Sequence, residues 1–225
     1  MFSKLIIVLV AGGVVFAGCS GEGNSKTSLF QLMESSHTKI TFENTLDYTD
    51  ELNVYTFRNF YNGGGVGLGD INNDGLPDIF FAGNLVSNKL YLNKGNFVFE
   101  DITATSGIGI ENAWTTGVSL VDINADGFLD IYICKSGPPG GERRNNELFI
   151  NNGDFTFSER SREYGLDFVG LSIHAAFFDY DKDGDLDCYL LNNSIRSVGG
   201  YDLRKDQRNI PDTLGGNKLL RNDDG

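Results

Sequence analysis

The chain has 225 residues, of which 40% are hydrophobic and 22% charged, a composition typical of a globular protein with one sizeable core. Its formal net charge of −13 argues against a nucleic-acid-binding protein, because contacts with phosphate need a basic surface. Two histidines leave little room for a histidine-based zinc site or catalytic triad, and three cysteines are too few for a disulfide framework. Nucleic acid is therefore not an expected partner.

The beginning of the chain has the pattern of an export signal. Residues 5–17 are uncharged and mostly apolar, a length typical of a signal peptide and shorter than the roughly 20 residues of a membrane-spanning helix. Two small residues then precede Cys19, which resembles the lipobox of bacterial lipoproteins. We expect a signal peptide over 1–18, a lipidated Cys19 with a flexible tether over 19–28, and membrane anchoring in the bacterial cell envelope, at the outer membrane and facing either the periplasm or the cell surface. The alternative is an ordinary signal peptide in which Cys19 is incidental.

The rest of the chain contains a threefold internal repeat, which is the strongest signal in the sequence. Similar segments begin at Gly65, Gly117 and His174: GVGLGDINNDGLPDIFF, GVSLVDINADGFLDIYI and HAAFFDYDKDGDLDCYL. Each is followed by a short apolar stretch that starts with asparagine. In the first two repeats a turn with asparagine and glycine and an aromatic strand come next, which is a hairpin signal. No segment has a sustained 3.6-residue apolar period, so helices should be few.

Each repeat predicts four short antiparallel strands in about 40–50 residues, which is the size of a β-propeller blade. We expect an all-β fold, a partial β-propeller with blade 1 over 63–112, blade 2 over 113–170 and an incomplete blade 3 over 171–225. A segment over 29–62 precedes the blades and either adds an outer strand or covers the open edge. Because blade 3 lacks its last strand and an open edge is a liability, we expect either a fragment of a longer propeller or several chains assembled into a ring.

Every repeat carries the acidic string D-x-[DN]-x-D-G-x-x-D between its first two strands. Oxygen atoms at alternate positions, with a glycine that permits a sharp bend, can surround one hard cation, and an all-oxygen set favours Ca²⁺ over Mg²⁺. We expect about one structural Ca²⁺ per blade, three in all. The expected ligands, with a backbone carbonyl from the seventh position, are Asp70, Asn72, Asp74, Leu76, Asp78, Asp122, Asn124, Asp126, Phe128, Asp130, Asp179, Asp181, Asp183, Asp185 and Asp187. The alternative is a set of polar turns without metal.

The acidic loops differ from EF-hands, since their twelfth position is Phe81, Ile133 or Leu190 instead of glutamate. A nine-residue loop that runs into an apolar strand resembles the FG-GAP/VCBS repeat, the calcium-binding blade also found in integrin α-chain propellers. The stretches FYNGGGVGLGDINNDGLPDIFFAGN, NKLYLNKGNFVFEDIT and AAFFDYDKDGDLDCYLLNN more closely resemble the bacterial cartilage-acidic-protein-like branch of that family. The resemblance extends over residues 42–225, and it implies a propeller of about seven blades.

Basic residues gather in two connections between the second and third strands. From the first aspartate of the loop to the asparagine of the third strand there are 18, 24 and 38 residues in the three repeats, and the added residues all fall in these connections. In a blade they lie on the face opposite the acidic loops. We expect there a binding face for an acidic glycan or protein, or simply solvated loops. Its basic residues are Lys135, Arg143, Arg144, Arg196, Arg204, Lys205 and Arg208.

These observations predict a calcium-binding lipoprotein of the bacterial cell envelope that mediates adhesion or glycan or protein recognition. Calcium is expected to be structural, with no catalytic residues and no enzyme activity, because protein oxygens fill its coordination positions. Two alternatives remain: the N-terminal part of a calcium-dependent polysaccharide-active enzyme such as a lyase, or a purely structural scaffold. Cys134 and Cys188 are expected either to form a disulfide between blades or to remain buried thiols.

Overall fold

The computed structural model describes residues 28–109, 113–137, 144–193 and 214–223. The chain divides into two units, residues 1–32 and 33–225, and the described residues of the first have no regular secondary structure. The expected signal peptide, Cys19 and most of its tether lie outside the described residues. Within the described part, no helix is long and apolar enough to cross a membrane.

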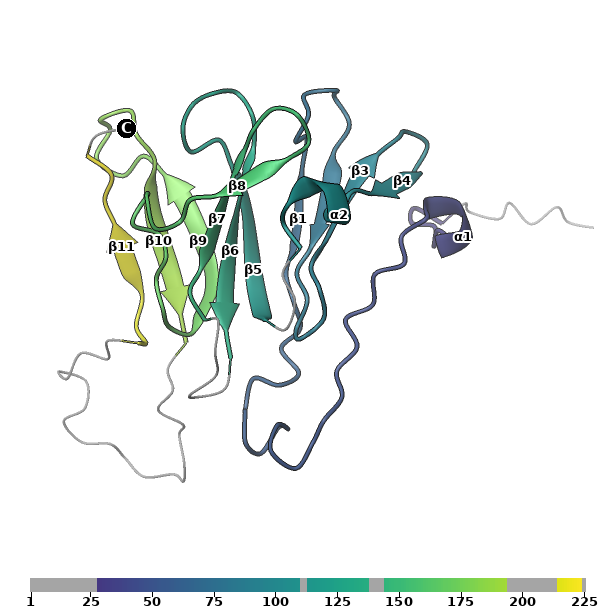
Figure 1. The fold of residues 1–225 in the computed structure, drawn as a ribbon, viewed down its shortest axis with the longest axis horizontal. Helices are drawn as coiled ribbons and strands as arrows, with labels where there is room; N and C mark the ends of the chain where they lie inside the picture. Colours follow the sequence, from purple (N-terminus) through teal and green to yellow (C-terminus); the bar gives the residue numbers. More distant parts are fainter. Residues whose placement is uncertain (1–27, 110–112, 138–143, 194–213, 224–225) are drawn as a thin grey trace, which may run out of the picture. The chain divides into compact units, whose positions relative to one another are not determined.

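In the described part of the second unit, the regular secondary structure is almost all β-strand, arranged in three antiparallel sheets (Figure 1). The strands of blade 1 are β1 (Val66–Gly69), β2 (Asp78–Phe81), β3 (Lys89–Asn93) and β4 (Phe99–Asp101). Those of blade 2 are β5 (Trp114–Val121), β6 (Asp130–Ser136), β7 (Glu147–Asn151) and β8 (Phe157–Glu159). Those of blade 3 are β9 (Ser172–Phe178), β10 (Asp187–Asn192) and β11 (Lys218–Leu220). The helices α1 (Ser35–Thr38) and α2 (Thr103–Ser106) have four residues each. The prediction of an all-β fold, a partial propeller of four-stranded antiparallel blades, is confirmed, and the third blade has three strands among the described residues.

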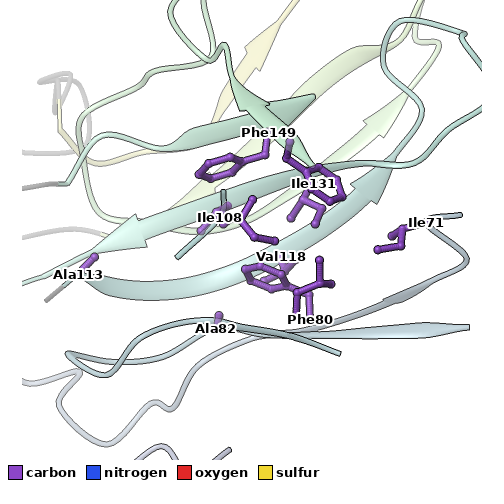
Figure 2. Packing of buried hydrophobic residues seen from close by; sticks show 11 residues of the cluster. Ile71, Phe80, Ala82, Ile108, Ala113, Val118, Ile131 and Phe149 are labelled. Carbon is purple, nitrogen blue, oxygen red and sulfur yellow. The ribbon is translucent and has the colours of Figure 1, made fainter. Parts of the chain in front are cut away.

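Alternation of side chains along the strands gives each blade one face toward each neighbour. Between blades 1 and 2, Phe80 from β2 is 1% exposed and lies in one cluster with Val118 and Ile131 from blade 2 (Figure 2). Between blades 2 and 3, Tyr132 and Leu190 belong to a second cluster and are fully buried. The hydrophobic core is therefore a series of layers between blades.

The same positions become exposed where the described residues supply no neighbouring blade. Val66 is the repeat equivalent of Val118, and it is 56% exposed while Val118 is 6% exposed. At the other end, Tyr189 is 40% exposed and its equivalent Tyr132 is 0% exposed. Burial at these positions thus depends on an adjacent blade, since the residue types are the same or similar.

Residues 29–62 add no strand among the described residues, and the part of this segment in the second unit, residues 33–62, packs against blade 1. The ring of Phe42 stacks on that of Phe81 with 5.0 Å between centroids. The backbone N–H of Thr41 donates to the hydroxyl of Tyr91 at 3.2 Å. This segment therefore covers part of the face of blade 1 that points away from blade 2.

Candidate calcium loops

The three acidic loops connect the first and second strands of each blade, and their backbone hydrogen bonds repeat. In blade 1, the carboxylate of Asp70 accepts the backbone N–H groups of Asp74 at 3.1 Å and Gly75 at 2.7 Å. The corresponding donors in blade 2 are Asp126 and Gly127 to Asp122. In blade 3, Gly184 donates to Asp179 in the same way, and the second donor is Lys182, one position earlier in the loop. The first aspartate therefore closes each loop into a tight turn.

Each loop turns at a glycine with positive φ. The angles are 86° for Gly75, 89° for Gly127 and 103° for Gly184. A Cβ atom added at any of the three would meet no atom within 4 Å. Glycine is needed here because of the backbone conformation and not because space is short.

The last aspartate of each loop is buried and bound at both carboxylate oxygens. Asp130 is 0% exposed, and it accepts the backbone N–H of Ile123 at 3.1 Å and that of Asn151 at 2.8 Å. Burial raises the pKa of Asp130 to about 6, although the two hydrogen bonds oppose the rise. The corresponding donors are Ile71 and Asn93 to Asp78, and Tyr180 and Asn222 to Asp187. Burial also raises the pKa of Asp78.

The asparagine that ends the third strand was missed as a site residue from the sequence, where it was assigned only to the hairpin turn. Asn151 supports the second loop through its backbone, and its side-chain amide donates to the carbonyl of Ile71 in the first loop at 2.8 Å. A signal was present, because the third strands of the repeats share two asparagines five residues apart: NKLYLN, NELFIN and NKLLRN. The second asparagine of each is Asn93, Asn151 or Asn222.

In the third loop, three carboxylates converge. Asp179, Asp181 and Asp187 each place an oxygen atom within 4.8 Å of the other two. Partial desolvation raises the pKa of Asp181, and the charges of Asp183 and Asp187 raise it further. An all-oxygen cluster in which like charges face one another fits a hard divalent cation such as Ca²⁺.

The first two loops have an asparagine at the position of Asp181. The side-chain amide of Asn72 donates to Asp74 at 3.0 Å, and that of Asn124 donates to Asp126 at 2.8 Å. All fifteen expected ligands lie in loops that the structure describes. The residues expected to bind the ion through a backbone carbonyl directly follow the glycine of each loop. These residues are Leu76, Phe128 and Asp185. Their backbone N–H groups donate hydrogen bonds to the side chains of Asp74, Asp126 and Asp183.

Each connection between the second and third strands is closed by an equivalent hydrogen bond, at the end of the strands opposite the acidic loops. In blade 1, the backbone N–H of Gly83 donates to the side-chain oxygen of Asn88 at 2.8 Å. The corresponding bonds join Lys135 to Asn146 at 2.9 Å and Asn192 to Asn217 at 3.1 Å. The bonded residues are 5, 11 and 25 residues apart in sequence. Connections of different length therefore begin and end at equivalent positions of the three blades.

One residue expected on the basic face is buried in the structure. Lys135 was wrongly placed on it: β6 continues to Ser136, so the side chain of Lys135 lies within the sheet, is 1% exposed and pairs with Glu147. Arg144 is partly buried at the start of the following segment. The remaining expected members, Arg143, Arg196, Arg204, Lys205 and Arg208, lie outside the described residues.

The two buried cysteines belong to the layer between blades 2 and 3. Cys134 lies on β6 and Cys188 on β10, and both are free thiols. Burial raises the pKa of Cys188 to about 12, and it raises that of Cys134 as well. Of the two expected alternatives, the structure has the buried thiols.

Comparison with known proteins agrees with this architecture. Residues 48–133 match the FG-GAP-like repeat family, a range that includes the first two acidic loops. The chain is 31% identical over 144 residues to cartilage acidic protein 1 of Xenopus tropicalis, which covers 61% of this chain and 21% of that protein. It is 30% identical over 136 residues to cartilage acidic protein 1 of Mus musculus, which covers 60% of this chain and 20% of that protein.

Integrin alpha-8 of Gallus gallus is also similar, with 31% identity over 107 residues, 41% of this chain and 10% of the integrin. The chain spans about a fifth of the length of the cartilage acidic proteins it matches. The third acidic loop lies beyond the family match, but it shares with the first two the hydrogen bond from the glycine to the first aspartate and that from the second loop residue to the last aspartate. Residues 48–133 are thus similar to the FG-GAP-like repeat family, and the chain is similar to cartilage acidic protein 1 and to integrin alpha-8.

Proposed function

We propose that this chain is a calcium-stabilised recognition module of the cell envelope. The observation that carries the proposal is the convergence of Asp179, Asp181 and Asp187 in a loop whose hydrogen bond from glycine to the first aspartate recurs in two other blades. Each loop offers oxygen atoms alone, as Ca²⁺ prefers. The chain's homology to an integrin α chain supports a role in adhesion or recognition.

In this proposal, Ca²⁺ is held by the side chains at the first, third, fifth and ninth loop positions and by the carbonyl at the seventh. The ion would neutralise carboxylates that otherwise repel one another. Three ions would change the formal charge from −13 to −7, because each adds two positive charges. Since the ninth residue is also bound by the end of the third strand, the ion would stabilise three strands of each blade through a single aspartate.

Recognition is favoured over catalysis by the cavity at the start of β1, β5 and β9. Its volume is about 420 Å³, and its lining includes glycines, Asn59, Asn62 and Ser136. His174 is the one titratable side chain among the lining residues in the described part of the chain. A lyase needs a base and a charge neutraliser that converge on the substrate, so this cavity fits binding better.

The sequence of the first residues places the module outside the cytoplasm in this proposal, anchored through a lipidated Cys19. Extracellular calcium modules bind with dissociation constants of about 10⁻⁴–10⁻³ M, which suits such a location. The partner would be an acidic glycan or protein, bound at the end of the strands opposite the acidic loops. Arg144 is the described basic residue of that face.

The test is native mass spectrometry of the protein in calcium and after treatment with a chelator. We expect three bound Ca²⁺ ions that the chelator removes, and weaker retention of Mg²⁺ at the same concentration, because Mg²⁺ requires tighter octahedral geometry. A folded protein that binds no Ca²⁺ would contradict the proposal. Circular dichroism on the same samples distinguishes that result from loss of folding.

A further inference from the structure

The asparagine directly before the third strand of blade 2 links that blade to blade 3. The side-chain oxygen of Asn146 accepts the backbone N–H of Lys135 at 2.9 Å. Its side-chain nitrogen donates to the hydroxyl of Tyr132 and to that of Ser172 in blade 3, both at 2.9 Å. The Tyr132 hydroxyl in turn donates to the carbonyl of Leu166 at 3.0 Å. In this layer, both polar atoms of the asparagine side chain are therefore hydrogen-bonded.

The equivalent asparagine of blade 1, Asn88, has fewer partners. Its side-chain oxygen accepts the N–H of Gly83 at 2.8 Å, which fixes the orientation of the amide group. Its side-chain nitrogen is buried and has no hydrogen-bond partner among the described residues. The cause lies in β2, where Phe80 takes the place of the tyrosine and supplies no hydroxyl. Blade 3 has the tyrosine again, and there Asn217 donates to Tyr189 at 3.1 Å.

A hydroxyl group on the other side of the same layer is also unpaired. Thr115 of β5 is buried, and it corresponds in the repeat to Ser172. Its Oγ1 atom has no hydrogen-bond partner in the part of the chain that the structure describes. The backbone N–H of Thr115 donates to the carbonyl of Gly83 at 3.1 Å, while the N–H of Gly83 donates to Asn88. Because both residues bind the same glycine, their unpaired groups are neighbours.

The chemistry of these groups defines what can bind between them. The amide nitrogen of Asn88 can only donate, so the ligand must accept a hydrogen bond. Phe80 and Ile108 belong to the apolar cluster between blades 1 and 2, which disfavours a charged ligand (Figure 2). The space is that of one oxygen atom, since it corresponds to the hydroxyl by which tyrosine differs from phenylalanine. Buried polar groups without a protein partner are commonly paired with an ordered water.

We infer that one buried water molecule lies between blades 1 and 2, at the position that the Tyr132 hydroxyl has between blades 2 and 3. The water accepts a hydrogen bond from the amide of Asn88 and shares one with the hydroxyl of Thr115. It donates to the carbonyl of Ile108, which corresponds in the repeat to that of Leu166. About three partners are typical of a buried water. The inference depends neither on bound calcium nor on the proposed function.

A high-resolution crystal structure of the full chain tests the inference directly. We expect electron density for a water within about 3.2 Å of Nδ2 of Asn88. In Phe80→Tyr, the tyrosine hydroxyl should take this position, and the melting temperature should rise by about 2–4 °C because an ordered water is released. Phe149→Tyr is the matched control. It adds a hydroxyl to the same apolar cluster, and it should lower the melting temperature because a polar group is buried there.

The substitution Thr115→Val distinguishes a bonded hydroxyl from an unpaired one. If the water is present, the variant removes one of its partners and should melt about 2–4 °C lower. Thr115→Ser is the control, because it keeps the hydroxyl and should retain the water. A higher melting temperature for Thr115→Val would overturn the inference, because loss of an unpaired buried hydroxyl is stabilising. A crystal structure without water density beside Asn88 would overturn it as well.

Discussion

The side-chain amide of Asn73 in the first acidic loop donates to the backbone carbonyl of Gly127 in the second, at 2.9 Å. A second bond joins the same two blades, from the amide of Asn151 to the carbonyl of Ile71. The second and third loops lack the first of these links, because Ala125 occupies the position of Asn73. The first two loops are therefore connected as a pair, and an ion in one should affect the other.

The first prediction is that calcium binding to these two loops is positively coupled through Asn73. Asn73 has φ of 59°, so Asn73→Gly removes the amide and preserves the backbone conformation. In isothermal titration calorimetry, calcium in one loop should raise the calcium affinity of the other loop. We expect this factor to be about two- to fivefold smaller in the variant. Ala125→Gly is the matched control, as it has no side chain that reaches the third loop. Unchanged coupling in Asn73→Gly would show that the bond does not transmit binding.

The second prediction concerns the buried amide of Asn151, which donates to the carbonyls of Ile71 and Leu129. Asn151→Ala leaves both carbonyls without this donor in a buried place, and we expect the free energy of unfolding to fall by about 2 kcal/mol. Asn93→Ala is the control, because the amide of Asn93 is more exposed and donates only within its own blade, to Pro77. Urea unfolding of both variants measures the difference. An equal loss in both would mean that the bond between blades adds nothing.

The third prediction separates charge from geometry in the third loop. Asp181→Asn gives this loop the ligand types of the first two, and it removes a carboxylate that faces Asp179 and Asp187. Without calcium the variant should melt at a higher temperature, because like-charge repulsion decreases. With calcium it should bind about tenfold more weakly at this loop, because a charged ligand is lost.

Asp185→Asn is the matched control for this loop. It removes one charge from the same segment, but the expected contribution of Asp185 is its backbone carbonyl, which the substitution retains. Thermal melts in calcium and in chelator, together with native mass spectrometry, compare the two variants. If both variants lose calcium equally, net loop charge and not the ligand position determines binding.

Much of the fold and of the loops could be predicted from the sequence, because the same pattern of residues occurs in three repeats. Glycine at a fixed loop position predicts the positive φ that the structure has at Gly75, Gly127 and Gly184. Alternating apolar residues on either side predict strands. A pattern that recurs in three copies is strong evidence even where a single copy would be only an acidic turn.

The sequence was less informative where a role depends on contacts between blades. Asn151 looks like a hairpin residue from local sequence, and its bond to Ile71 spans 80 residues. Lys135 looks like a loop cation, because the end of β6 is not marked by a turn residue until Gly137. Its burial results from strand pairing with Thr115 across the sheet, which no local pattern reveals.

The fourth prediction tests the burial of Lys135. Lys135→Met should lower the free energy of unfolding by about 3 kcal/mol, because it removes the cation that pairs with Glu147 in a largely buried place. The double variant with Glu147→Leu should recover much of this loss, since both charges are then absent. A double-mutant cycle in urea measures the coupling. Independent effects of the two substitutions would indicate that the pair contributes no interaction of its own.

The last prediction concerns the two thiols between blades 2 and 3. Because burial raises the pKa of Cys188 to about 12 and also raises that of Cys134, the reactive thiolate is scarce at pH 8. We expect both thiols to react with iodoacetamide slowly in the folded protein and rapidly in urea, as measured by mass spectrometry. Cys188 should react before Cys134, because it is among the lining residues of a surface cavity of about 670 Å³ and Cys134 is not. Fast labelling of both thiols in the folded protein would contradict their burial.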